Sequence, residues 1–302
     1  MLSFKHEVFL EVAQHLSYTK ASQVLYISQP AVTKHIQQLE DHYRASLFER
    51  KGNSISLTDV GRILLDHLLE AKNIEKKLDF EISTRTSHAE ARGALRLGAS
   101  TTVALYIIPP VLSGFRKNFP SIQLSLLNRN SENILQALLD HEIDLGIIEG
   151  KKKMPRVKSD HFLTDEVVPV CSSKSDLAKK NILSIVDLRK TPVALRERGS
   201  GTLTALKSAL AGKSIKIGDL NVVMQLGGTE ALKNFILADD CIGFLPMRAI
   251  TKELASGELT RLFINDLSII RHFYFVHRQG EEQQGLHEMF VRFAKTHYNI
   301  KL

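Results

Sequence analysis

The spacing of apolar residues changes at about residue 92, and this change constrains the fold more than any other feature. Before it, apolar side chains recur every three or four residues, which is the period of amphipathic helices. After it, short apolar runs alternate with helical stretches, which predicts right-handed βαβ units and a mostly parallel sheet. The 302 residues suffice for about two domains, so we expect an all-α head followed by an α/β region.

Composition narrows the class of protein. Hydrophobic residues make up 43% of the chain and charged residues 24%, which excludes a disordered or fibrous protein. The apolar runs are too short for a membrane helix, and Glu7 and Glu11 interrupt the first apolar stretch, which argues against a secretory signal. The cysteines are Cys171 and Cys241 alone, and the 12 histidines lack metal-ligand spacing, so we expect no metal and no other cofactor. We therefore expect a cytoplasmic protein that has no membrane partner.

Three short helices and a hairpin are predicted for residues 1–58. The third helix follows Ser28, which is a favourable N-cap, and Pro30 suits its first turn. Residues 47–57 contain two extended pieces around a Gly52-Asn53 turn. This order is typical of a winged helix-turn-helix, whose third helix enters the DNA major groove while the wing lies on the phosphate backbone.

The predicted third helix has an apolar face and a polar face. At about 100° per residue, Val32, Ile36 and Leu39 cluster on the apolar side, and the opposite face carries groups that can read base edges. Residues 1–92 hold 12 basic and 12 acidic side chains, so local placement of cations, rather than bulk charge, must attract DNA. A small helical bundle with a solvated polar face is the alternative. The candidate DNA-contacting residues are Thr19, Lys20, Ser28, Gln29, Pro30, Thr33, Lys34, Gln37, Arg50 and Lys51.

Residues 59–92 form the predicted connection between the head and the α/β region. A long helix capped by Thr58 runs to about residue 85, and its apolar positions step by three or four residues. Such a narrow apolar stripe on a charged helix is typical of pairing with a second helix. The polar stretch 83–92 has no periodicity and is interpreted as a hinge.

Short motifs occur in a fixed order along almost the whole chain. In the head they are Tyr18-Thr19-Lys20-Ala21, Ser28-Gln29-Pro30-Ala31-Val32-Thr33, Ile36-Gln37-Gln38-Leu39-Glu40, Leu47-Phe48-Glu49-Arg50 and Leu57-Thr58-Asp59-Val60-Gly61. Further along they include Gly98-Ala99-Ser100, Phe119-Pro120, Asp144-Leu145-Gly146, Gly199-Ser200-Gly201-Thr202 and Glu230-Ala231-Leu232-Lys233. In these motifs the chain resembles the LysR-type transcriptional regulators.

The resemblance implies a fold and a domain organisation. Residues 1–58 would form the winged helix-turn-helix and residues 59–92 a dimerising linker helix and hinge. Residues 93–302 would form an effector-binding domain of two α/β lobes, similar to periplasmic solute-binding proteins; lobe I comprises 93–165 and 268–302, and lobe II comprises 166–267. A homodimer or tetramer is implied. One departure is Arg44, which stands where the family has glycine, so it must adopt the left-handed conformation or end the helix differently.

Two hydroxyl-rich segments each follow a predicted strand and open a predicted helix. Helix N-termini present free N–H groups and the positive end of the dipole, and the hydroxyls add donors, so two such segments facing each other across a cleft would bind a small anion. Hydroxyls that merely cap their helices are the alternative for each segment. The resemblance favours effector binding, because both segments fall where the family binds effectors. The candidate effector-binding residues are Ser100, Thr101, Thr102, Gly199, Ser200, Gly201, Thr202 and Thr229.

The function predicted on these grounds is a DNA-binding transcriptional regulator of the LysR type. It would bind double-stranded promoter DNA and be switched by a small anionic effector between the lobes, and residues 197–202 and 228–233 look most like those of regulators of sulfur or carbon assimilation. No G-x-S-x-G elbow is present, so we expect no catalytic residue and no enzyme activity. Two alternatives stay open: a small-molecule-binding or enzymatic α/β protein whose helical head serves assembly only, and a redox-sensing regulator that uses Cys171 and Cys241.

Overall fold

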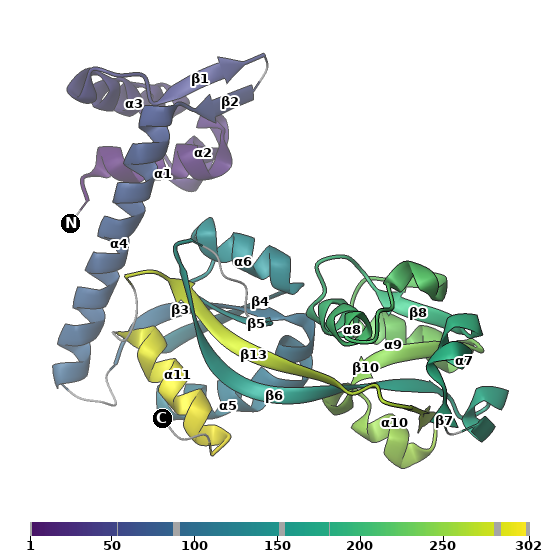
Figure 1. The fold of residues 1–302 in the computed structure, drawn as a ribbon. Coiled ribbons are helices and arrows are strands. Elements are labelled where there is room, and N and C mark those ends of the chain that lie inside the picture. Colours follow the sequence, from purple (N-terminus) through teal and green to yellow (C-terminus); the bar gives the residue numbers. More distant parts are fainter. Residues whose placement is uncertain are drawn as a thin grey trace. The chain divides into compact units, whose positions relative to one another are not determined.

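The structure, a computed structural model, describes residues 2–52, 54–86, 91–150, 155–180, 182–280 and 285–299 (Figure 1). The contacts within the chain divide it into two compact units, an N-terminal unit, Met1–Thr86, and a C-terminal unit, Ser87–Leu302. None of the described helices is long and apolar enough to cross a membrane.

The N-terminal unit contains three short helices, a hairpin and a long helix (Figure 1). Its elements are α1 (Phe4–His15), α2 (Tyr18–Val24), α3 (Gln29–Tyr43), β1 (Phe48–Lys51), β2 (Ser54–Leu57) and α4 (Asp59–Thr86). An apolar cluster holds the short helices and the hairpin together, and Phe9, Val32 and Leu47 are fully buried in it. Strands β1 and β2 pair antiparallel, which confirms the predicted winged helix-turn-helix.

Helix α3 ends at Arg44 without the glycine that usually occupies such a position. Arg44 adopts the left-handed conformation, with φ of +50°, at a cost of roughly 1–2 kcal/mol for a residue with a Cβ. The carboxylate of Glu40 then accepts hydrogen bonds from the amides of Leu47, at 2.7 Å, and Phe48, at 3.4 Å. Glu40 therefore fixes the start of the wing against α3.

A nine-stranded sheet runs through the described part of the C-terminal unit in the order β4-β3-β5-β13-β6-β10-β8-β9, with β11 paired to β6. Its strands are β3 (Gly93–Ser100), β4 (Ile122–Arg129), β5 (Leu145–Glu149), β6 (Val157–Ser172), β8 (Pro192–Arg196), β9 (Asn221–Leu226), β10 (Ile242–Pro246), β11 (Leu259–Arg261) and β13 (Ile269–Arg278). The short strands β7 (Ile182–Leu183) and β12 (Phe263–Ile264) pair with each other in a separate sheet.

The prediction of a mostly parallel sheet is wrong for the sheet as a whole. Pairing is parallel for β3 with β4 and β5, and for β8 with β9 and β10. The long strands β6 and β13 pair antiparallel with each other and with their other neighbours, and so join the two parallel halves. The sequence predicts a strand only over Glu166–Cys171, the second half of β6, because polar and exposed residues occupy much of its first half.

Helices cover both halves of the sheet. They are α5 (Ile108–Asn118), α6 (Ser131–Leu139), α7 (Ile185–Lys190), α8 (Gly201–Ala211), α9 (Thr229–Ala238), α10 (Thr251–Ser256) and α11 (Leu286–His297). Shorter turns are the π-helical η2 (Val103–Ile107) and the 3-10 helices η3 (Asp176–Lys180), η4 (Ile217–Asp219) and η5 (Met247–Ala249). In lobe II, α8 packs into one apolar cluster and α9 into another, on different sides of the strands. The predicted two-lobed α/β architecture is confirmed.

Candidate nucleic-acid interface and inter-lobe site

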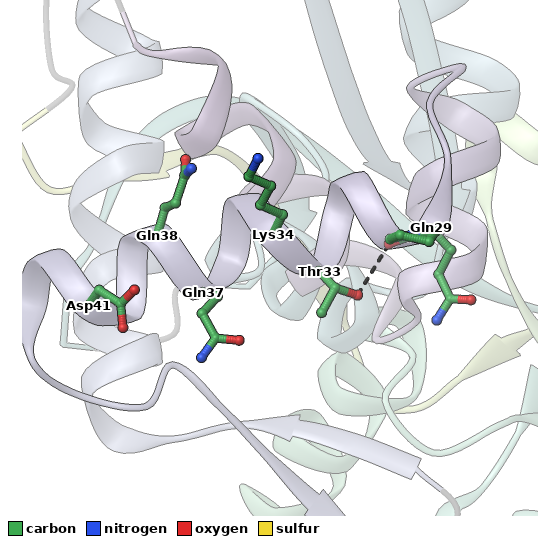
Figure 2. A pocket seen from close by; sticks show the side chains of 7 residues that line it. Gln29, Thr33, Lys34, Gln37, Gln38 and Asp41 are labelled. Carbon is green, nitrogen blue, oxygen red and sulfur yellow. Dashed lines mark hydrogen bonds between the residues drawn. The ribbon is translucent and has the colours of Figure 1, made fainter.

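The outward face of α3 carries the polar residues that the sequence singled out (Figure 2). A concavity of about 520 Å³ is lined by Gln29, Pro30, Thr33, Lys34, Gln37, Gln38 and Asp41. The opposite face of the helix contributes Val32, Ile36 and Leu39 to the core, where each is at most 3% exposed. Because the apolar face is buried in the unit, the polar face is directed outward.

Two of the predicted residues on this helix use their hydroxyls on the backbone. The Oγ of Ser28 accepts a hydrogen bond from the amide of Ala31 at 3.4 Å and so caps the helix. The Oγ1 of Thr33 donates to the carbonyl of Gln29 at 3.1 Å, as Figure 2 shows. The exposed amide side chains of Gln29 and Gln37 therefore remain the best candidates for bidentate hydrogen bonds to base edges.

The remaining DNA candidates lie on α2 and the wing. Thr19 and Lys20 are exposed in the first turn of α2, and Arg50 is exposed on β1. Lys51 belongs to β1, but its side chain lies outside the described residues. Gln38 and Asp41 also line the concavity on α3 but were not predicted, although each stands four residues after a predicted contact and hence on the same helix face.

In lobe I, two of the predicted effector residues have buried hydroxyls. Ser100, at the end of β3, is 2% exposed, and Thr102, which precedes η2, is fully buried; Thr101 between them is half-buried. Within the described part of the chain, the Oγ of Ser100 and the Oγ1 of Thr102 have no hydrogen-bond partner. A buried hydroxyl without a partner costs about 1–3 kcal/mol, so this is a place where a ligand or water would be stabilised.

In lobe II, the corresponding hydroxyls are bonded to the protein. The Oγ of Ser200 accepts from the amide of Leu203 and caps α8. The Oγ1 of Thr202 accepts from Nη1 of Arg271 at 2.9 Å and donates to Oε2 of Glu149 at 3.4 Å. The Oγ1 of Thr229 accepts from Nη1 of Arg196 at 2.6 Å. Helix capping therefore does not account for all of these hydroxyls, since those of Thr202 and Thr229 also bond to charged side chains.

The network around Thr202 is buried and reaches from lobe II to Glu149 and Arg271, which the predicted bounds place in lobe I. Nη1 of Arg271 lies 2.7 Å from Oε2 of Glu149, and Nη2 lies 2.7 Å from Oδ2 of Asp165, with all three side chains at most 4% exposed. Next to Arg196 in lobe II, burial disfavours the charged form of Glu197, but hydrogen bonds from Arg196 and the amide of Gly228 outweigh it and lower the pKa of Glu197. The sequence did not reveal these residues as partners, because they come from segments far apart in the chain.

A second contact between the lobes involves the π-helical turn that follows Thr102. The hydroxyl of Tyr106 on η2 donates to the carboxylate of Glu230 on α9, and the ammonium of Lys233 lies 5.8 Å from the centre of the Tyr106 ring. Burial disfavours the charged form of Lys233, yet ion pairs with Glu253, at 2.6 Å, and Glu230, at 3.0 Å, raise its pKa. The turn that directly follows the unpaired hydroxyls is thus in contact with lobe II.

The placement of the two cysteines argues against redox chemistry. Cys171 packs into the apolar cluster around α8, whereas Cys241 packs into the cluster around α9 on the other side of the strands, so their thiols point away from each other. Burial raises the pKa of Cys171 to about 11 and that of Cys241 to about 12. Thiols of such high pKa are poor nucleophiles at neutral pH. In the described residues, no group of three or more His, Cys, Asp or Glu side chains could hold a metal ion.

Two models of known protein families match the chain, one over each site. The family model for the bacterial regulatory helix-turn-helix protein, lysR family, matches residues 5–62, and the model for the LysR substrate binding domain matches residues 88–299. The chain belongs to the LysR family. It is a DNA-binding transcriptional regulator with a two-lobed effector-binding domain, and the alternative of a head that serves assembly only is not favoured.

Relatives and solved structures agree with this assignment. The chain is 30% identical over 277 residues to the RuBisCO operon transcriptional regulator of Allochromatium vinosum, covering 91% of this chain and 89% of that one. It is 28% identical to the regulatory domain of Synechocystis PCC6803 CcmR, solved in complex with 2-PG, with a TM-score of 0.61 over 68% of this chain and 97% of that one. Full-length CbnR, solved with its target DNA, is 18% identical, shares the fold with a TM-score of 0.64, and covers 98% of this chain and 99% of that one. The predicted resemblance to regulators of sulfur or carbon assimilation is consistent with these relatives.

Proposed function

We propose that this LysR-type regulator reads promoter DNA with the outward face of α3 and is switched by a small anion bound between its lobes. The observation that carries the first half is the division of α3 into a buried apolar face and an outward polar face. Gln29 and Gln37 would contact base edges, and Lys34, Lys20, Arg50 and Lys51 would contact phosphates. Thr19, Ser28, Pro30 and Thr33 would complete the surface as positioning groups.

We assign one role to each part of the chain. Residues 1–58 would bind DNA, residues 59–92 would dimerise and act as a hinge, and residues 93–302 would bind the effector in lobes I (93–165 and 268–302) and II (166–267). Support for dimerisation comes from α4, where Ile63, Ile74 and Leu78 are 55–68% exposed. Large apolar side chains in such number on one helix are typical of an interface.

The inter-lobe site offers hydrogen-bond donors that a small anion can use. The unpaired hydroxyls of Ser100 and Thr102 can donate to it, and Thr101, Gly199, Ser200, Gly201, Thr202 and Thr229 would line the facing side. The related CcmR regulatory domain, whose structure holds 2-PG, supports the same class of ligand. The protein would act in the cytoplasm, where bacterial promoters lie, and would bind its effector without converting it.

Footprinting of the full-length protein on the region upstream of its own gene tests the DNA half of this proposal. We expect a protected stretch that contains two related half-sites, because paired heads on one dimer read two copies of the same sequence. The absence of any protected stretch at low salt would contradict the assignment of α3 and would favour a head used only for assembly.

Thermal-shift measurements with sulfate, phosphate and 2-PG test the effector half. The wild-type protein should be stabilised by at least one of these anions, and Ser100→Ala should reduce the shift because it removes one of the donors. Ser125→Ala is the matched control, since Ser125 is exposed on the edge strand β4. If no anion shifts the wild-type melting temperature, the anionic class is wrong.

A further inference from the structure

The carboxylate of Glu149 occupies the place where the sequence predicts an external anion. Glu149 ends β5 of lobe I, and its Oε2 lies against the first turn of α8 in lobe II, within 3.4 Å of the Thr202 hydroxyl. A Cβ on Gly201 would overlap both this oxygen and the Cβ of Glu149. Glycine at 201 is thus what allows the carboxylate to approach the N-terminus of the helix so closely.

The surroundings of this oxygen have the composition of an anion receptor. It meets the positive end of an 11-residue helix, the hydroxyl of Thr202 and the guanidinium of Arg271 at 2.7 Å. Arg271 is already neutralised on its other side by Asp165, its direct partner in the β6–β13 ladder. Two buried carboxylates therefore share the buried guanidinium of Arg271, and Nε of Arg248, 3.6 Å from Oδ1 of Asp165, supplies the second positive charge of the cluster.

The unpaired hydroxyls of lobe I lie at the same edge of the sheet. Strands β3 and β5 are parallel neighbours, with Ala99 opposite Ile147, so the carboxyl ends that carry Ser100 and Glu149 lie side by side. An anion held at this edge of the sheet by Ser100 and Thr102 and reaching the start of α8 would meet the carboxylate of Glu149 there. The two negative charges would repel each other as long as Glu149 stays in place.

We propose that Glu149 is a tethered competitor of the effector. In the absence of ligand its carboxylate takes the anion position at α8 and holds lobe II against lobe I. A soluble anion that binds between the lobes displaces it from Thr202 and Arg271, and this exchange changes the contact between the lobes. The inference rests on the proposed anionic effector. It adds the mechanism by which binding of that effector would change the contact between the lobes.

Glu149→Gln is the variant that isolates the charge. Glutamine has the same shape, its amide oxygen can still accept from Thr202, and Arg271 keeps its ion pair with Asp165, so the fold has no buried cation left alone. The matched control is Glu166→Gln, which makes the same change of charge one residue after Asp165, at a carboxylate that pairs with Arg261 instead.

The affinity of the full-length protein for sulfate, phosphate and 2-PG, measured by titration calorimetry, tests the proposal. We expect Glu149→Gln to bind the anion that stabilises the wild type about ten-fold more tightly or better, and Glu166→Gln to stay within about two-fold. Equal or weaker binding by Glu149→Gln, when the wild type binds, overturns the competitor role and leaves the anionic effector standing. If neither protein binds any of the three anions, both ideas fall.

Hydrogen exchange supplies a test without ligand. Loss of the carboxylate should speed exchange of the amides at the start of α8 in Glu149→Gln relative to Glu166→Gln. Unchanged exchange there would show that Glu149 does not hold the lobes together and would also overturn the proposal. Faster exchange combined with unchanged or weaker anion affinity would identify Glu149 as a structural ion pair only, which again contradicts competition.

Discussion

The two candidate sites of this regulator are built in opposite ways. The groups proposed to read base edges lie on one helix, α3, and the internal bonds of that helix are local, such as the contact of Thr33 with a carbonyl four residues earlier. Between the lobes, Thr202 meets Arg271 across 69 positions of sequence, and Arg271 meets Asp165 across 106. A surface for a long rigid partner can be encoded by one helix, whereas an enclosed site for a small ligand requires distant segments to converge.

Salt should separate the two sites most strongly. A DNA complex with about 6–10 phosphate contacts should lose about 10³–10⁵ in affinity between 50 and 200 mM salt, because bound counterions are released from DNA. The ion pairs of Arg271 are at most 4% exposed and are screened far less, so the melting temperature of the C-terminal unit should change little. Gel shifts and thermal melts over the same salt series would show both effects. DNA affinity that stays flat across the series would contradict the proposed interface.

Matched core substitutions test whether the two units are stable independently. Phe9 is fully buried in the N-terminal unit beside Phe48, and Phe290 is fully buried in the C-terminal unit beside Phe115. Replacing either by Ala should destabilise its own unit by about 3–5 kcal/mol through lost contacts and a cavity. Urea unfolding followed by DNA binding and by anion-dependent stability would assign each loss to a unit. A single transition that moves equally in both variants would mean that the units unfold together.

The contrast between local and distant contacts also explains which elements and site residues could be predicted from the sequence. The helices of the head, its wing and the longer strands of both lobes were predictable because periodicity, caps and turn residues are local signals, whereas the short strands β7, β11 and β12 were not predicted. The first half of β6 was missed because its exposure pattern follows from pairing with β13, about 100 residues later. The hydroxyls of the inter-lobe segments were identified, but Glu149 and Arg271 were not, since nothing near them in sequence indicates that they meet. Charged partners of this kind are determined by the tertiary fold.

Single substitutions on α3 should weaken specific DNA binding by an intermediate amount. Gln29→Ala and Gln37→Ala should each cost about 1–3 kcal/mol for the specific site if the amide makes a bidentate base contact. Lys34→Ala should weaken specific and non-specific binding alike, because a phosphate contact carries no sequence information. Gln14→Ala, an exposed glutamine on α1, is the control. Competition gel shifts with a scrambled duplex distinguish the two patterns, and equal losses for Gln14 and Gln37 would argue against base readout.

The capping serines allow the smallest and most direct comparison. Ser28 and Ser200 each accept one amide hydrogen bond at a helix start, but Ser28 is exposed and Ser200 is 1% exposed. In Ser28→Ala, water can replace the lost acceptor, so we expect a loss of about 0.5–1 kcal/mol from the N-terminal unit. In Ser200→Ala, the amide of Leu203 is left buried without its acceptor, so the C-terminal unit should lose about 1–3 kcal/mol. Urea denaturation of the two variants measures the difference. A larger loss for Ser28→Ala would mean that burial does not govern the strength of these caps, and that the start of α8 is more accessible to water than its contacts with Glu149 imply.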